Sequence, residues 1–229
     1  MRLVTILTSI MLLGCASLMW ANTPRDVTVF EAKHRKVTNS KASEAAAPTD
    51  HPSMVELRDI DSAVVATAAE KLKKHADHGD KMLYLRINSN GGSVFAGLDF
   101  IQSVEELKKK GAKLTCIVDT RAISMGFVIL QAVCDVRLAT PRALFLAHNG
   151  SLRTDGGRVD DMEEDVALLS IINETMAEIC SEKIGMTLEE YKHKLHDKKS
   201  WSFGAKEAVR ENAVDRLIAP MDVPLLDEE

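Results

Sequence analysis

Residues 114–133 read LTCIVDTRAISMGFVILQAV and join a strand-like run directly to an apolar, helix-like run. The first part, Leu114 to Val118, is rich in β-branched residues, and Phe127 to Val133 continues as an apolar helix. Ser124 stands at the junction between the two. In an α/β fold, a serine at such a junction sits on exposed backbone, where it can serve as a nucleophile. The stretch therefore indicates an α/β architecture and a candidate reactive residue.

Two neighbouring segments carry residue types that complement Ser124. Upstream, INSNGGSV (Ile87 to Val94) places two glycines after a strand, and their backbone N–H groups can point into a site without obstruction by a Cβ. Downstream, the run ALFLAHNG contains His148. Each segment alone fits a plain structural role: a tight turn, a helix N-cap or a structural histidine. Together, they supply oxyanion donors, a nucleophile and a general base for acyl transfer.

The rest of the chain alternates predicted strands and helices. We predict helices over Ser62–His75, Val94–Lys110, Ser124–Val133, Asp160–Ile184 and Leu188–Leu195, strands over Lys81–Asn88, Leu114–Asp119, Asp135–Ala139 and Ala143–Ala147, and a last helix and strand within Glu207–Ile218. This alternation is typical of βαβ units and a mostly parallel sheet. Ligands of such sheets bind beyond the carboxyl ends of the strands, which is where Gly92, Ser124 and His148 are expected.

Composition narrows the choice of function. A chain of 229 residues suits one core with appendages, and 34 acidic against 29 basic residues give a net charge of −5, which disfavours nucleic acid as a partner. Aromatic residues make up only 4%, a balance that favours aliphatic α/β packing. The histidines and cysteines show no metal-ligand spacing, so we predict neither a metal nor another cofactor.

The N-terminus carries the pattern of an export signal. Arg2 precedes an apolar run, Leu3 to Leu13, that is too short to span a bilayer comfortably. The residues Leu12 to Cys15 resemble a lipobox, so Cys15 is a candidate lipidated N-terminus, with ordinary cleavage near Trp20–Ala21 as the alternative. We predict a signal peptide over 1–21, a linker over 22–53, a folded domain over 54–222 and an acidic tail over 223–229. The expected location is the periplasm or cell envelope.

Three further cysteines, Cys116, Cys134 and Cys180, lie among apolar neighbours. We expect them to be buried rather than catalytic. An odd number in an oxidising compartment leaves at least one thiol unpaired or bridged between chains, and the sequence leaves the pairing open.

Four blocks resemble the caseinolytic (Clp) protease proteolytic subunit. INSNGGSVFAGL resembles the family's I-N-S-P-G-G-x-V-x-A-G block and AISMG its A-A-S-M-G box, while PRALFLAHN and KEAVRENAVD are similar to its histidine and closing blocks. The similarity covers roughly Met54 to Ile218. It implies the α/β fold of the Clp/crotonase superfamily, with stacked ββα units, a mostly parallel sheet and a projecting long helix over Asp160–Ile184 that matches the family's handle.

The resemblance also implies roles for particular residues. Ser124 would be the nucleophile, His148 the general base, and the N–H groups of Gly92 and Met125 the oxyanion hole. The family's third member, an aspartate, lacks a clear counterpart. A gapless match back from the tryptophan at 201 gives Leu195, and a match forward from Leu188 gives Lys194.

Asp197 is the nearest carboxylate to that position, and we name it as the expected orienting residue. His193 and His196 are the other hydrogen-bonding groups nearby. If no acid reaches His148, the site is expected to act as a Ser-His dyad or to be degenerate.

Export and the resemblance together predict an ATP-independent serine endopeptidase that hydrolyses peptides or unfolded protein segments. We expect a homo-oligomer with no ATPase partner, and membrane contact only through a lipid on Cys15. One alternative is a catalytically silent Clp-like binding or assembly protein. The other is a crotonase-like acyl-CoA enzyme, suggested by the segment CDVRLAT at 134–140.

Overall fold

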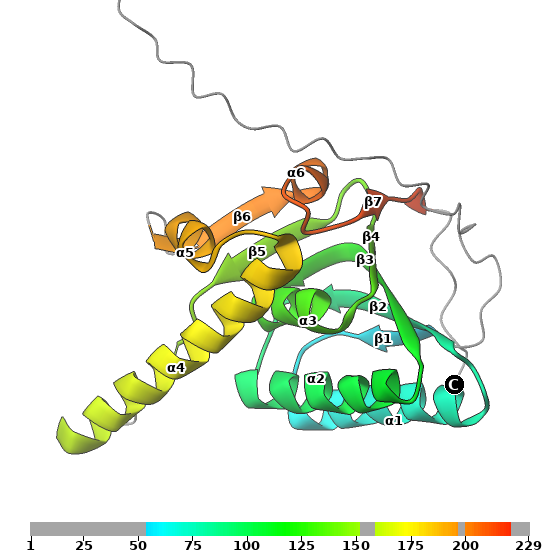
Figure 1. Ribbon diagram of the computed structural model, residues 1–229, viewed down its shortest axis with the longest axis horizontal. Helices are drawn as coiled ribbons and strands as arrows, with labels where there is room; N and C mark the ends of the chain where they lie inside the picture. The colour runs from blue at the N-terminus through cyan, green and yellow to red at the C-terminus, as the bar shows by residue number, and fades with distance from the viewer. Residues whose placement is uncertain (1–53, 152–158, 197–199, 221–229) are drawn as a thin grey trace, which may run out of the picture. The chain divides into compact units, whose positions relative to one another are not determined.

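The computed structural model describes residues 54–151, 159–196 and 200–220. The elements, in order, are β1 (Met54–Leu57), α1 (Ser62–Asp77), β2 (Met82–Ser89), α2 (Val94–Lys109), β3 (Lys113–Ile123), α3 (Met125–Val133), β4 (Val136–Ala139), β5 (Leu144–His148), α4 (Val159–Ile184), α5 (Leu188–His196), β6 (Ser200–Gly204), α6 (Ala205–Arg210) and β7 (Arg216–Leu217) (Figure 1). Every helix and strand predicted within these residues is present. The strands β1 and β6 were not predicted.

One sheet runs through the domain, and it is mostly parallel, as the alternation of strands and helices predicts. Its main path is β1-β2-β3-β4-β7, with all neighbours parallel, and β6 lies antiparallel to β5. The strand β3 is longer than predicted because, on the side away from β2, it pairs with two strands in succession. Its first half pairs with β4, and its last residues, Arg121 to Ile123, pair with β5. The second pairing carries β3 up to Ser124 and brings β5 beside it.

The main core lies between the sheet and the first three helices. Alternate residues of the central strands, such as Leu85 and Cys116, join a buried cluster with the apolar faces of α1 and α2. A smaller cluster that includes Tyr84 and Ile117 occupies the other face of the sheet. A strand places successive side chains on opposite faces, so both faces carry apolar residues.

Helix α3 is the most buried helix of the core. All its residues except Ala132 are buried, as expected for a helix that is apolar all round. Its only polar side chain, Gln131, donates to the Ala213 carbonyl and accepts from the Arg137 guanidinium. A helix fixed on every side holds the residue before it, Ser124, in a fixed position.

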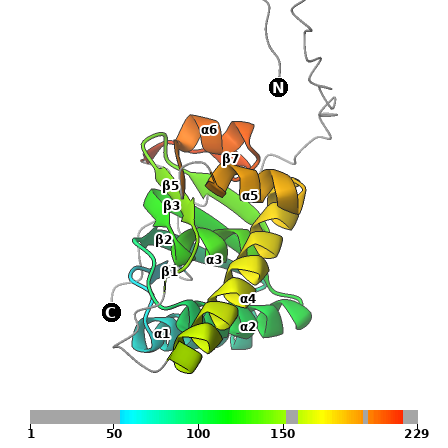
Figure 2. The same ribbon diagram turned by 90° about the vertical axis from the view of Figure 1, so that its left-hand side faces the viewer.

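Helix α4 is buried over only part of its length. The sequence predicts one apolar face along the whole helix, but only its second half, including Ile172 and Met176, packs into the core. The first half extends away from the sheet, and Figure 2 shows the same helix from the side. Its exposed apolar side chains are Met162, Val166, Leu168 and Ile171. None of the helices within the described ranges combines the length and the apolar character that a membrane span requires.

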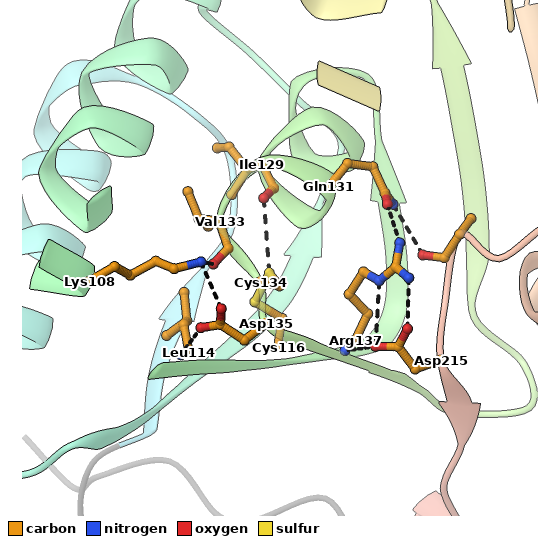
Figure 3. The surroundings of a disulfide bond; sticks show 11 residues. Lys108, Leu114, Cys116, Ile129, Gln131, Val133, Cys134, Asp135, Arg137 and Asp215 are labelled. Carbon is orange, nitrogen blue, oxygen red and sulfur yellow. Dashed lines mark hydrogen bonds and ion pairs between the residues drawn. A yellow bond between two sulfur atoms is a disulfide. The ribbon is translucent and has the colours of Figure 1, made fainter. Parts of the chain in front are cut away.

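A disulfide joins Cys116 in β3 to Cys134 at the end of α3, and both residues are buried (Figure 3). Two ion pairs lie near it, Lys108 with Asp135 and Arg137 with Asp215. Cys180 is a buried free thiol. The structure thus gives the pairing that the sequence leaves open, and the bonded pair brackets Ser124.

The disulfide should stabilise the domain mainly through the unfolded chain. Its sequence separation of 18 corresponds to about 3 kcal/mol of loop-closure entropy. Urea unfolding with a reductant present should therefore give a free energy of unfolding lower by about this amount. The variant Cys116→Ala/Cys134→Ala is the matched control, because the reductant should leave its midpoint unchanged. Equal midpoints for the natural chain with and without reductant would show that the bond does not form.

Candidate active site

Ser124 has a backbone conformation that side chains rarely adopt. Its φ of 55° and ψ of −126° lie in a sparsely populated region that costs about 1 to 3 kcal/mol. It occupies the N-cap position of α3, yet its side chain makes no cap hydrogen bond. Asp61 and Ser93 do cap their helices in this way. The hydroxyl of Ser124 is therefore held on a strained strand-to-helix turn without serving as the helix cap, as in a nucleophile elbow.

The glycine turn lies directly against this serine. A Cβ built on Gly91 would stand 2.6 Å from the Ser124 Cβ, and the φ of Gly91 is +96°. One residue further on, a Cβ on Gly92 would stand 2.1 Å from the carbonyl oxygen of Ile60. Only glycine allows the turn to approach both neighbours so closely.

The pairing of Gly92 determines where its N–H points. Ile60 donates to the Gly91 carbonyl and accepts from the Ser93 N–H, so both hydrogen bonds of this bridge belong to the residues flanking Gly92. In an extended segment, successive N–H groups point to opposite sides, so the Gly92 N–H points away from Ile60. That side belongs to β3 and Ser124, because β2 lies between β1 and β3 in the sheet.

His148 ends β5 beside the serine. The Ser124 N–H donates to the Leu146 carbonyl at 2.8 Å, two residues before the histidine. The ring atom Nδ1 of His148 lies 2.6 Å from the carbonyl oxygen of Asn149. A carbonyl only accepts, so Nδ1 donates in this contact, and in the neutral tautomer with that proton Nε2 is the acceptor nitrogen.

Ser124 and His148 line one small hollow of about 10 Å³, close to the room that a single water molecule needs. No hydrogen bond joins the two side chains in the described part of the chain, and such bonds often tighten only when substrate binds. Apolar residues also line the hollow, including Val128, Met176, Ala177 and Leu195, together with Asn149, Asn173 and Tyr191. The hollow thus combines a hydroxyl, an imidazole and an apolar surface.

Asp197, the predicted orienting acid, lies outside the described residues. Three residues further along the chain, Ser200 pairs with His148 across the antiparallel β5–β6 ladder. Of the residues predicted for the site, the structure brings Gly92, Ser124, Met125 and His148 to the same edge of the sheet.

Cys180 lies close to the hollow but is unsuited to nucleophilic chemistry. Burial raises the pKa of its thiol to about 12, although the Tyr191 hydroxyl, which lines the hollow, hydrogen-bonds to it. At neutral pH the group is therefore a thiol rather than the reactive thiolate. Ser124 remains as the candidate nucleophile. No group of three or more histidines, cysteines or acids in residues 54–151, 159–196 and 200–220 is arranged to hold a metal ion.

Comparison with known proteins shows the family of the chain. The family model described as Clp protease matches residues 53–221. The chain belongs to the Clp protease family. It is 31% identical over 156 residues to the ATP-dependent Clp protease proteolytic subunit 2 of Bifidobacterium longum, which covers 67% of this chain and 72% of that protein. It is 30% identical over 161 residues to the ATP-dependent Clp protease proteolytic subunit 1 of Streptomyces coelicolor, which covers 70% of this chain and 71% of that protein.

Membership in the Clp protease family and the mostly parallel sheet confirm the expected α/β fold class. Family membership also supports the assignment to the serine peptidases. Sequence reasoning missed two polar groups near the site, the carbonyl of Asn149 and the side chain of Asn173, which lines the same hollow. A main-chain carbonyl leaves no trace in residue type. Asn173 lies in a helix far along the chain, where a lone asparagine attracts no notice.

Proposed function

We propose that the protein is a serine endopeptidase in which Ser124 attacks the scissile carbonyl and His148 acts as general base. The bond from Ser124 Oγ to the carbonyl carbon forms while the hydroxyl proton passes to His148 Nε2. The same proton then protonates the leaving amine, and a water activated by the imidazole releases the acyl group. The strained conformation of Ser124, with its hydroxyl unused as a cap beside His148, is the observation that carries the proposal.

The oxyanion hole in this proposal consists of the N–H groups of Gly92 and Met125. The Gly92 N–H points to the serine side of the turn, and Met125 is the first residue of α3, where N–H groups have no intrahelical acceptor. Two donors fixed by backbone stabilise the negative charge that develops on the substrate oxygen. Asp197 remains the proposed carboxylate for orienting His148.

We further propose that the enzyme acts in the periplasm or cell envelope, without ATP or an ATPase partner. The disulfide between Cys116 and Cys134 supports this location, because structural disulfides persist mainly in oxidising compartments. The substrates would be peptides or unfolded segments. The exposed apolar residues on the first half of α4 support self-association into a homo-oligomer.

Labelling with a fluorophosphonate tests the serine chemistry directly. The natural protein should be labelled in the absence of ATP, because the probe phosphonylates an activated serine hydroxyl. Ser124→Ala should abolish the labelling. Ser93→Ala provides a matched control, since Ser93 caps α2 in the neighbouring turn. A folded natural protein that resists the probe would favour the catalytically silent alternative, and labelling that survives Ser124→Ala would place the nucleophile elsewhere.

A further inference from the structure

A single peptide group lies between His148 and helix α4. Its carbonyl, from Asn149, accepts the hydrogen bond from His148 Nδ1 at 2.6 Å. Its N–H, from Gly150, donates to Asn173 Oδ1 at 2.7 Å. The peptide unit is planar, so the position of one end determines the position of the other. The imidazole is therefore connected to α4 by two hydrogen bonds in series.

Asn173 is well placed to hold this peptide. It belongs to the half of α4 that packs into the core, next to the buried Ile172 and close to Met176. Its side chain lines the hollow together with Ser124 and His148. A polar group on a packed helix is held more precisely than one on a loop.

The direction of the two hydrogen bonds has an electronic consequence. Donation from the Gly150 N–H to Asn173 polarises the peptide and increases the negative charge on the Asn149 oxygen. That oxygen faces the ring nitrogen which, in a Ser-His-Asp triad, donates to the carboxylate. A carboxylate there keeps the proton on Nδ1 and stabilises the imidazolium that forms during attack. A polarised carbonyl can do the first and contributes part of the second.

We propose that Asn173 is a positioning residue for His148 and acts through the Asn149–Gly150 peptide. This inference rests on the proposed function of His148 as general base. By holding the peptide, Asn173 selects the tautomer in which Nε2 is free to accept the serine proton. In the described structure Nδ1 is thus held by a neutral group made of backbone and one amide, and the carboxylate proposed at Asp197 would have to displace the Asn149 carbonyl to contact the same nitrogen.

The test compares Asn173→Ala, which removes the acceptor, with Asn173→Asp, which keeps an oxygen in its place. Thr175→Ala is the matched control, because Thr175 is exposed on the same helix and its hydroxyl donates to the Ile171 carbonyl of that helix. Asn173→Leu is the second variant, since it fills the space without an acceptor. The tautomer of His148 is read from the ¹⁵N shifts of histidine-labelled protein, with His148→Gln to assign the signals.

In the natural protein and in Thr175→Ala, Nδ1 should carry the proton. Asn173→Ala and Asn173→Leu should shift the ring toward the mixed tautomers of a free imidazole. With a fluorogenic peptide, kcat should fall about three- to ten-fold, the value of one neutral hydrogen bond, while KM is unchanged. Asn173→Asp should keep the natural tautomer and most of kcat.

An unchanged tautomer in both Asn173→Ala and Asn173→Leu would overturn the inference. The inference would also be overturned if Asp197→Asn shifted the His148 ring toward mixed tautomers while Asn173→Ala did not. The carboxylate, and not the peptide, would then hold the ring. The NMR measurement requires no turnover. Failure to react with a fluorophosphonate would therefore contradict the proposed function. The ¹⁵N shifts of His148 would still decide whether Asn173 sets its tautomer.

Discussion

The double variant Ser124→Ala/His148→Ala should be no less active than either single variant. Each single variant should lower kcat/KM for a fluorogenic peptide by roughly 10⁴- to 10⁶-fold, because nucleophile and base act as one unit. Once the hydroxyl is gone, the imidazole has no proton to accept. Activity that remains would come from the oxyanion donors and substrate binding.

This non-additivity separates a catalytic pair from two independent contributions. Kinetics of the two single variants and the double variant, with thermal unfolding to confirm that each one folds, provide the complete cycle. Losses that multiply in the double variant would mean that His148 does not act through Ser124. His75→Ala is a suitable control, since this histidine lies in α1 and should leave kcat/KM unchanged.

Gly91→Ala should disable the enzyme through the serine rather than through the turn itself. The added Cβ would lie 2.6 Å from the Ser124 Cβ and 3.0 Å from its Oγ, so the serine must move. A displacement of about 1 Å in a reacting group can lower the rate about 100-fold. We expect that fall in kcat/KM, together with a loss of roughly 3 to 5 kcal/mol of stability from the positive φ and the overpacking.

Gly111→Ala is a close control for this substitution. Gly111 has a φ of +95°, against +96° for Gly91, but a Cβ there meets nothing within 4 Å. It should lose about 1 to 2 kcal/mol from backbone strain alone and keep its activity. Urea unfolding and peptide kinetics on the two variants measure both effects. Equal losses of activity in the two variants would show that the contact with Ser124 is unimportant.

The sequence predicted the elements that have strong local patterns. The apolar period of Ser62–His75 gives α1, and the apolar run after Ser124 gives α3. Two glycines after a strand predict the turn. The structure requires glycine there because a Cβ would collide with Ser124 or Ile60. These features were predictable since each depends on residues that are adjacent in the chain.

The parts that were missed depend on residues distant in sequence. The strand β6 is short and exists because it pairs with β5 more than 50 residues earlier. The extension of β3 to Ile123 likewise requires β5 as a second partner. The unusual φ of Ser124 follows from both ends of its turn being fixed by packing. No local propensity encodes any of these.

The acceptor beside the His148 ring has a consequence for how the gene can vary. Every amino acid carries a main-chain oxygen, so a missense change at position 149 leaves that oxygen in the chain. A side-chain carboxylate, in contrast, disappears with a single codon change. A substitution at position 149 should therefore leave the acceptor at Nδ1 in place, while a proline at position 150 would remove the N–H that anchors the same peptide.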